Sequence, residues 1–415
     1  MTPNVYIIGT AMIKFGKYLN RSIKDLSGEA LELVLKDCDL GKNAIEAAWF
    51  SNTGWGMTDF QHCIRGQVAL SANGLDKIPM TNVENACASA STALHGAWTA
   101  VRAGLYDCVL AIGAEKVYSN DRAQMMKGFM AGTDVEFTTR YIEQLKAQAR
   151  EKAKTEAETD TSGKKEKKEG HSVFMDFYAF GARQHMKTYG TTQRQLAVIA
   201  AKAHNNSTLN PLAQYTFPQT VEEVLADYEV AWPLTRAMCS PTGDGSAAVI
   251  LCSEKFLKTL SGVRPVRIRA SVLRSGSWQE NDISARAGKA ACEMAGVSPE
   301  EIQVAEVHDA TAFGELHQTE QLGFCPVGEG GPFAERGATA LAGKIPVNPS
   351  GGLISRGHPI GASGLAQIHE LVTQLRGEAG KRQVGNSPRM ALAENGGGTI
   401  GTGEAAMCIH ILEKV

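Results

Sequence analysis

Short uninterrupted apolar runs along the chain predict buried β-strands. The first covers residues 5–9, Val-Tyr-Ile-Ile-Gly, and the second covers residues 108–113. Further runs of this kind lie at 247–252, 266–272 and 407–412. Residues 23–36 instead repeat their apolar positions at helical spacing. Strands without polar alternation, separated by helices, indicate an α/β fold whose sheet is covered on both faces.

Two predicted helices 274 residues apart resemble each other. The shift aligns Ala88, Ser89, Leu94, His95, Thr99, Val101 and Arg102 with Ala362, Ser363, Ile368, His369, Thr373, Leu375 and Arg376, and five of these pairs are identical. Each segment opens with small residues and continues as a helix with one apolar side. Two similar halves that share a central helix layer produce this pattern, and chance similarity of two amphipathic helices is the alternative.

One segment has a different composition. Residues 143–169 hold eight basic and seven acidic residues among 27, and almost no large apolar side chains. We expect a solvated helix in its first part and a mobile loop over residues 159–170. A charged surface insertion explains this composition. The alternative is a segment that docks a partner or closes over a ligand carrying phosphates.

Length and charge narrow the function classes. The 415 residues are enough for two to three domains, since a domain takes roughly 150 residues. Lys and Arg number 42 against 44 Asp and Glu, and the resulting net charge of -2 disfavours nucleic acid as the main partner. No apolar run approaches the roughly 18 to 20 residues that span a bilayer, so we expect no membrane partner.

The nine cysteines are spread along the chain without a C-x-x-C pair. This spacing argues against a zinc ribbon or a redox dithiol within the chain. Nothing near residue 1 resembles a signal peptide, so we expect reduced thiols and a cytoplasmic protein.

Cys87 is the first candidate for chemistry. It lies in N-A-C-A-S-A-S, directly before a predicted helix. Small neighbours let a ligand approach, and a helix N-terminus stabilises a thiolate. A lone Cys is more often a small buried apolar residue than a nucleophile, so this hypothesis requires a base nearby.

Two histidines have surroundings suited to that base. His358 lies in a Gly-rich loop, N-P-S-G-G-L-I-S-R-G-H-P-I-G-A-S-G, that runs into the second copy of the repeated helix. His308 follows an apolar run in A-E-V-H-D-A, and strand ends often carry catalytic side chains. The stretch E-N-G-G-G-T at 394–399 either brings backbone N–H groups to an oxyanion or forms a plain tight turn.

These blocks, in this order, resemble the thiolase superfamily, and most closely its branch of sterol-carrier-protein-type and archaeal acetoacetyl-CoA thiolases. The similarity covers essentially the whole chain, and G-H-P-I-G-A-S-G is its most specific motif. It implies an α/β fold of five αβαβα layers, duplicated and with an inserted loop domain. The implied division is an N-terminal half at 1–117 and 241–262, a loop domain at 118–240 that contains the charged insertion 143–169, and a C-terminal half at 263–415.

The resemblance also implies roles for single residues. Cys87 matches the nucleophile that takes the acyl group as a thioester, and His358 matches the histidine that activates it. His308 and His358 match the groups that bind the thioester oxygen of the acyl-CoA. Gly397 matches the glycine whose N–H joins that of Cys87 in the oxyanion hole, and Ser240 matches a serine that contacts pantetheine.

One departure from the family pattern touches two positions. Most thiolases carry a second cysteine as acid/base, either at the place of Asn395 or, in the sterol-carrier-protein type, near that of Ala310. A C–C step still needs a positioned group to move a proton, which contributes about 10²-fold to 10⁴-fold. We therefore expect His308 or His358 to replace the missing cysteine, which gives a Cys-His-His set.

The implied activity is that of an acyltransferase of the acetyl-CoA acyltransferase or 3-oxoacyl-CoA thiolase type. CoA cleaves a 3-oxoacyl-CoA through a Cys87 acyl-enzyme, or the reverse Claisen condensation forms one. CoA is a co-substrate, and no cofactor or metal is bound permanently. The expected partners are acyl-CoA and CoA, further copies of the chain as a homodimer or dimer of dimers, and a small zinc-ribbon/OB-fold subunit that helps to hold CoA.

The acyl group and the exact reaction stay open at this point. Phe174, Phe177, Tyr178 and Phe180 fall in the implied loop domain and suit a bulky or aromatic acyl group, such as that of benzoylsuccinyl-CoA. Packing as the core of that domain is the alternative. Alternative functions are a thiolase-like acyltransferase with an aromatic acceptor, a C–C lyase or aldolase, and a non-catalytic CoA-binding subunit.

Overall fold

A nine-stranded mixed sheet forms the centre of the protein. The computed structural model describes residues 3–121, 125, 128–156, 172–385, 387–401 and 403–415. The strands, in spatial order, are β3 (Met80–Val83), β2 (Ala47–Ser51), β4 (Cys108–Glu115), β7 (Gly245–Ser253), β1 (Val5–Met12), β8 (Val266–Ser275), β11 (Gly403–Lys414), β10 (Met390–Ile400) and β9 (Val304–Glu306). All five apolar runs that predicted strands lie in these elements, which confirms those predictions.

The strand directions show that the two halves of the sheet repeat each other. From β1 outward, β7 pairs antiparallel, β4 antiparallel, β2 parallel and β3 parallel. From β8 outward, β11 pairs antiparallel, β10 antiparallel and β9 parallel, and Val347 adds a parallel bridge to Ala305. An antiparallel pair of β1 and β8 joins the halves. The sequence repeat therefore reflects a duplicated topology.

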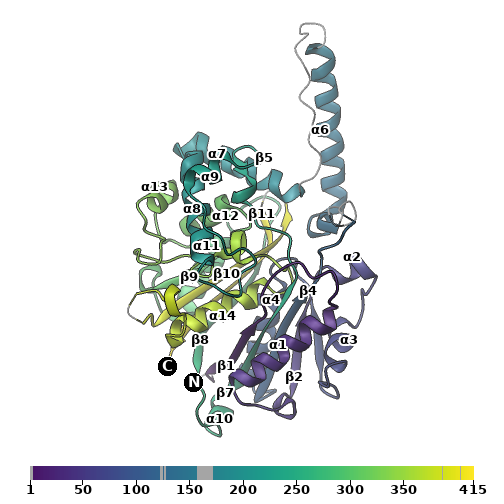
Figure 1. Ribbon diagram of the computed structural model, residues 1–415, viewed down its shortest axis with the longest axis vertical. Helices are drawn as coiled ribbons and strands as arrows, with labels where there is room; N and C mark the ends of the chain where they lie inside the picture. Colours follow the sequence, from purple (N-terminus) through teal and green to yellow (C-terminus); the bar gives the residue numbers. More distant parts are fainter. Residues whose placement is uncertain (1–2, 122–124, 126–127, 157–171, 386, 402) are drawn as a thin grey trace.

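Helices make the other three layers. The repeated segments form α4 (Ser89–Arg102) and α14 (Ser363–Arg376), whose bounds differ by the 274 residues of the repeat. These two helices pack together in one apolar cluster between the half-sheets. The outer layers hold α1 (Ile23–Asp37) and α3 (Arg65–Ser71) on one side, and α11 (Ile283–Ala295) and α12 (Ala312–Gln321) on the other (Figure 1). The five αβαβα layers confirm the predicted fold class.

The remaining helices of the two halves are short. They are α2 (Trp55–Asp59), α10 (Glu254–Leu257), α13 (Gly330–Glu335) and the 3-10 turns Lys42–Ala44, Pro299–Glu301 and Gly380–Arg382. A π-helix, η5 (Gly352–Arg356), precedes His358. None of the described helices is both long and apolar enough to cross a membrane.

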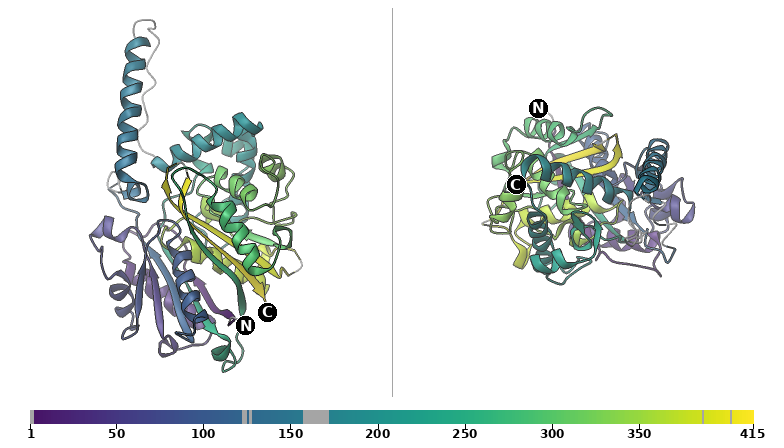
Figure 2. Two further views of the ribbon diagram at one scale, coloured as in Figure 1. Left: turned by 180° about the vertical axis from the view of Figure 1, so that it is seen from behind. Right: turned by 90° about the horizontal axis from the view of Figure 1, so that it is seen from above.

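The chain between β4 and β7 forms a separate group of helices beside the sheet. It contains η2 (Met130–Gly132), α6 (Val135–Glu156), α7 (Val173–Tyr189), α8 (Gln193–Ser207), α9 (Val221–Ala226), β5 (Glu229–Ala231), β6 (Leu234–Thr235) and η3 (Arg236–Met238). α6 projects far from the rest of the molecule (Figures 1 and 2). The helix predicted at the start of the charged insertion is the end of α6, whereas residues 157–171, with the predicted loop, lie outside the described residues. The domain boundaries stay a prediction.

Candidate active site

A tight turn between β3 and α4 holds Cys87. The amide of Ala88 donates to the Asn85 carbonyl at 3.0 Å, and the Ser89 hydroxyl donates to the Ala86 carbonyl at 2.6 Å. Ala86 adopts a left-handed φ of +47°, a strained conformation for a residue with a Cβ. Strain of this kind persists where the surroundings fix the turn, and here the turn presents Cys87 to the largest cavity of the described structure.

His358 faces the Cys87 thiol. Its Nε2 lies 3.3 Å from Cys87 Sγ, and its Nδ1 lies 2.7 Å from Ser363 Oγ. The Ser363 hydroxyl donates its proton to the Pro359 carbonyl, so Ser363 Oγ accepts a proton from His358 Nδ1. The unprotonated Nε2 of His358 is therefore left to accept the thiol proton, as a general base must.

His308 completes a set of three side chains with the opposite tautomer. The ligand atoms of Cys87, His308 and His358 lie within 4.8 Å of one another, and the two imidazole centroids are 5.3 Å apart. Asn395 Oδ1 accepts from Ser91 at 3.0 Å, so the Asn395 Nδ2 group donates to His308 Nδ1 at 3.1 Å. The proton of neutral His308 then sits on Nε2, where it is suited to polarise a carbonyl oxygen.

Burial keeps these three groups uncharged. It raises the pKa of the Cys87 thiol to about 12, and the buried carboxyl of Glu115 adds to that rise. Burial, the charge of His308 and that of Arg356 hold the pKa of His358 well below 6.5, while burial and Arg356 lower the pKa of His308 to about 4. A neutral thiol and imidazole thus rest side by side at neutral pH. The thiolate expected at the helix N-terminus forms only as His358 takes the proton.

The Gly-rich turn in β10 lies directly against the Cys87 turn. A Cβ on Gly397 would lie 2.3 Å from the Asn85 carbonyl oxygen and 2.4 Å from the Ala88 nitrogen, so no side chain fits there. The backbone N–H that hydrogen-bonds the Cys87 sulfur belongs to the next residue, Gly398, whose φ is +64°. The sequence pattern pointed to Gly397 and did not identify Gly398, because the choice between adjacent glycines depends on how the turn meets Cys87.

The two positions without a second cysteine lie at this site. Asn395 is buried and orients His308. Ala310 is buried and lines the cavity, and its carbonyl accepts the Ser240 amide at 2.9 Å. Neither side chain carries a proton that moves at neutral pH, so the acid/base groups beside Cys87 are the two histidines. Ser240 also lines the cavity, and its contact with pantetheine stays a prediction.

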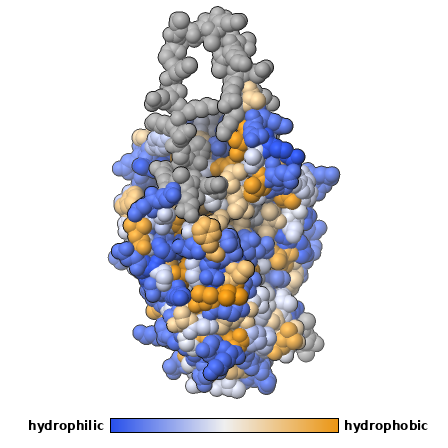
Figure 3. Space-filling view, turned by 90° about the vertical axis from the view of Figure 1, so that its right-hand side faces the viewer, coloured by the Kyte–Doolittle hydropathy of each residue, from blue (hydrophilic) through white to orange (hydrophobic). Residues whose placement is uncertain are grey.

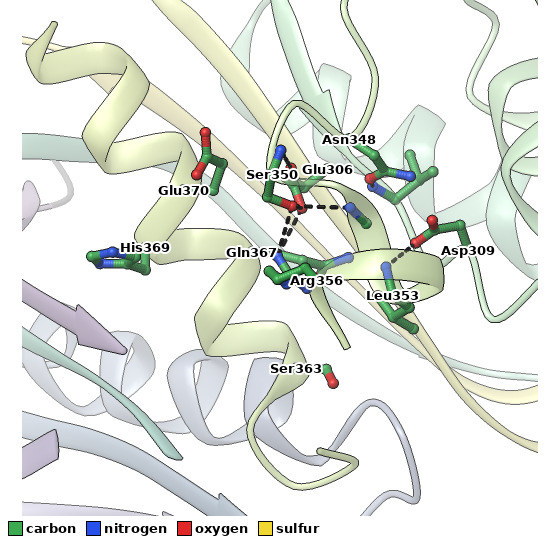
Figure 4. Close-up of polar contacts among 12 residues, drawn as sticks. Glu306, Asp309, Asn348, Ser350, Leu353, Arg356, Ser363, Gln367, His369 and Glu370 are labelled. Atoms are coloured by element: carbon green, nitrogen blue, oxygen red, sulfur yellow. Dashed lines mark hydrogen bonds and ion pairs between the residues drawn. The ribbon is translucent and has the colours of Figure 1, made fainter. Parts of the chain in front are cut away.

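A fully buried ion pair supports the two histidines from below. Arg356 Nη1 lies 2.9 Å from Glu306 Oε2, and Ser350 binds the same carboxylate through its hydroxyl at 2.8 Å (Figure 4). Both charged side chains have no exposed surface. Among the described residues, Nε and Nη2 of Arg356 have no hydrogen-bond partner, so part of the positive charge stays unshared. The motif that contains Arg356 was evident in the sequence, but its burial was not.

The same π-helix that ends at Arg356 is anchored next to His308. The Asp309 carboxylate accepts the Leu353 amide at 2.6 Å (Figure 4). A Cβ on Gly352, whose φ is +59°, would lie 2.0 Å from that carboxylate. Glycine is therefore required for the π-helix to reach Asp309, and this contact joins the loops of His308 and His358.

The cavity in front of Cys87 has a volume near 1970 Å³. The four aromatic residues predicted to form the acyl pocket, Phe174, Phe177, Tyr178 and Phe180, all line it. Phe180 is 52% exposed, so it is not part of a domain core. Phe137 of α6 and Trp278 meet edge to face at the wall, with centroids 5.3 Å apart. The space is larger than Cys87 and a small acyl group need, and it holds a ligand of substantial size.

The chain matches two family models. Residues 5–221 match "Thiolase, N-terminal domain", and residues 271–413 match "Thiolase C-terminal domain-like". Two solved structures have the same fold: the Ltp2-ChsH2(DUF35) aldolase, with a TM-score of 0.76 and 20% identity, and human mitochondrial 3-ketoacyl-CoA thiolase, with a TM-score of 0.68 and 16% identity. Each match covers 100% of this chain and 99% of the other.

Curated relatives are similar over most of their length. Acetyl-CoA acetyltransferase of Methanothermobacter thermautotrophicus is 37% identical, covering 99% of this chain and 100% of the relative. Human sterol carrier protein 2 is 35% identical over 94% of this chain and 69% of its own. The benzoylsuccinyl-CoA thiolase subunit BbsB of Thauera aromatica is 33% identical over 95% and 94%. Together with the Cys87–His358 geometry, these matches show that the chain belongs to the thiolase family and is an acyltransferase.

Proposed function

We propose that the protein catalyses CoA-dependent thiolysis of a 3-oxoacyl-CoA, and the reverse Claisen condensation, through an acyl-enzyme on Cys87. The observation that carries this proposal is the distance of 3.3 Å between Cys87 Sγ and the unprotonated Nε2 of His358. A thiol beside an imidazole whose other nitrogen is fixed by a hydroxyl is the arrangement of an activated nucleophile.

The steps follow from these positions. Cys87 Sγ attacks the ketone carbon while His358 Nε2 takes the thiol proton. The bond between C2 and C3 breaks, and the C2 carbanion takes a proton from His358 or His308 to leave as a shorter acyl-CoA. CoA then attacks the thioester, its thiol proton passes to the histidine that gave one up, and Cys87 leaves as a thiolate that regains its proton from His358. The Cys-His-His set thus replaces the second cysteine.

The first prediction concerns the acyl-enzyme. On mixing with acetyl-CoA or benzoyl-CoA without an acceptor, the intact mass increases by one acyl group, and peptide mapping places it on Cys87. Cys87→Ala shows no increase, whereas Cys63→Ser, which changes an exposed thiol, keeps it. An unmodified wild-type chain contradicts the proposal and favours the lyase, aldolase or CoA-binding-subunit alternatives. The aldolase among the structural neighbours gives that alternative its weight.

We propose a bulky or aromatic acyl group, of the kind named for the benzoylsuccinyl-CoA relative. The aromatic lining of the cavity supports this, because aromatic rings bury large flat surfaces well. Phe174 and Tyr178 contribute rings from α7, and Phe313 contributes one from α12. A phenyl group on the acyl-enzyme stacks in such a space, whereas an acetyl group leaves most of it to water.

We further propose a small zinc-ribbon/OB-fold subunit that helps to hold CoA. One structural neighbour, the Ltp2-ChsH2(DUF35) aldolase, includes a DUF35 component in its name, which supports a partner of this kind. The second prediction is that a tagged chain, purified from its own host, carries a small zinc-containing protein in stoichiometric amount. The purified pair then shows a lower KM for CoA than the chain alone. Full activity of the isolated chain at low CoA contradicts the need for this subunit.

We also propose a homo-oligomer, a homodimer or a dimer of dimers. β3 is an edge strand of the sheet, and α3 packs on it. Beside α3, Phe60 is 81% exposed and Ile64 is 59% exposed. Figure 3 shows apolar side chains on this face, between hydrophilic ones and below the projecting helix. An edge strand next to exposed apolar side chains favours pairing with a second copy.

A further inference from the structure

Two helices form one wall of the catalytic cavity along a seam of aromatic and polar side chains. A Cβ on Gly181 of α7 would lie 2.7 Å from the Phe313 ring of α12, so the helices meet closely there. At one end of the seam, His185 Nε2 lies 3.0 Å from Glu320 Oε2. At the other end, a Cβ on Gly314 would lie 3.5 Å from the Tyr178 ring and 3.0 Å from the His308 carbonyl oxygen. Tyr178 is therefore the seam residue next to the catalytic loop.

The hydroxyl of Tyr178 is a donor available for a ligand. Tyr178 lines the cavity, and among the described residues its hydroxyl has no hydrogen-bond partner. Burial, then the charges of Glu404 and Cys87, raise the pKa of Tyr178 well above 10, so it keeps its proton. A group that both Glu404 and Cys87 influence lies within reach of an acyl group held on Cys87.

Glu404 is an acceptor on the same lining. Its Oε1 accepts the Gln318 side chain at 3.1 Å, which leaves the other oxygen without a protein partner among the described residues. His317 also lines the cavity, stacked on Phe313 with centroids 5.8 Å apart. Burial lowers the pKa of His317, so it is neutral at neutral pH. Neither side chain brings a positive charge to this wall.

The cations that line the cavity are engaged elsewhere. Among the described residues these are Lys17, Arg183 and Arg236, and all three are exposed to solvent. Lys17 lies over the Tyr118 ring, Arg183 donates to the Trp232 carbonyl, and Arg236 pairs with Asp227. Exposed cations suit the phosphates of CoA. The wall of Tyr178, His317 and Glu404 lacks such a charge.

We propose that this wall selects an acyl group that carries a neutral hydroxyl, with Tyr178 donating to the hydroxyl oxygen and Glu404 accepting its proton. This rests on the proposed thiolase function and narrows its substrate class to hydroxylated, and preferably hydroxyaryl, acyl groups. A free carboxylate at the same place meets the charge of Glu404 without a cation to offset it. An unsubstituted ring leaves the donor and the acceptor unpaired, and an unpaired polar group in a site discriminates strongly against such a ligand.

The test uses four 3-aryl-3-oxopropanoyl-CoA thioesters that differ only in the para substituent: hydrogen, hydroxyl, methoxy or carboxylate. Methoxy has electronic effects on the ketone similar to those of hydroxyl but has no proton to donate. We expect kcat/KM for thiolysis to be about tenfold higher for hydroxyl than for methoxy, and lowest for carboxylate. Equal values for hydroxyl and methoxy overturn the inference.

Two variants assign the effect to its residues. Tyr178→Phe reduces the preference for hydroxyl over hydrogen to less than about twofold, and Glu404→Gln raises kcat/KM for the carboxylate substrate about tenfold. Tyr106→Phe, far from the cavity lining, keeps the wild-type pattern. Because each result is a ratio between substrates, partial misfolding of a variant does not imitate it. If the hydroxyl preference survives in Tyr178→Phe, the inference is wrong.

The same assays separate this inference from the proposed function. Aroyl adducts on Cys87 with all four thioesters, formed at equal efficiency, overturn the hydroxyl selection and leave the thiolase function intact. Absence of any adduct overturns the thiolase function itself.

Discussion

His358→Asn slows acylation of Cys87 about 10²-fold to 10⁴-fold, because it removes the only Nε2 acceptor that the described structure places beside the thiol. The thiol, with its pKa raised to about 12 by burial, does not ionise unaided at neutral pH. His308→Asn instead keeps most of the acylation rate and lowers the overall thiolysis and condensation rates, since His308 polarises the oxygen and serves the proton transfer at carbon. Time courses of adduct mass, compared with steady-state turnover, separate the two effects.

His62→Asn is the matched control, because His62 is an exposed histidine outside the catalytic cavity. It leaves both rates unchanged. If His308→Asn retains full thiolysis and condensation rates, a catalytic role for His308 is lost, and His358 alone replaces the missing cysteine. Full acylation in His358→Asn removes the proposed base.

Arg356→Met lowers the free energy of unfolding by roughly 3 to 5 kcal/mol, because it leaves the Glu306 carboxylate buried without its cation. The double variant Arg356→Met/Glu306→Gln recovers most of this loss, since the uncompensated charge is then absent. Arg286→Met, which breaks an exposed pair with Asp282, costs less than about 1 kcal/mol and serves as the control. Urea denaturation measures all three.

The loss in Arg356→Met depends on pH in a defined direction. Burial raises the pKa of Glu306 to about 7 even with Arg356 present, and Arg356 is the main group that opposes the rise. Without it the folded-state pKa rises further, so the folded variant binds a proton that the unfolded chain releases above about 4.5. Stability therefore falls as pH rises, and the variant is less destabilised at pH 6 than at pH 8.5. A loss independent of pH, or no recovery in the double variant, contradicts this account.

Sequence patterns predicted the elements that are apolar throughout. The runs at 5–9 and 108–113 became β1 and β4, because strands buried on both faces show no polar alternation that resembles a helix. The repeat predicted α4 and α14 residue for residue. The mixed directions of the strands were not predicted, since the pairing of β1 with β8 joins segments about 260 residues apart and no local pattern encodes it.

The catalytic set was predicted in part. Motif order placed Cys87, His308 and His358 together, and the structure brings their ligand atoms within 4.8 Å. The tautomers were not predictable, because they depend on Ser363 and Asn395, whose partners are fixed only by packing. The neutral thiol was missed for a related reason: the helix N-terminus is local, whereas the burial that outweighs it comes from the whole site.

The duplication has a consequence for the origin of this centre. The 274-residue offset pairs Cys87 with Gly361 and His358 with Glu84, so each half has kept one member of the reacting pair and lost the other. A lone ancestral half, associated with its own copy, had to place sulfur and imidazole on the same turn. Fusion of two copies in one gene allowed each turn to specialise. The division of labour between nucleophile and base is thus inherited from covalent linkage, and neither half expressed alone can reconstitute it.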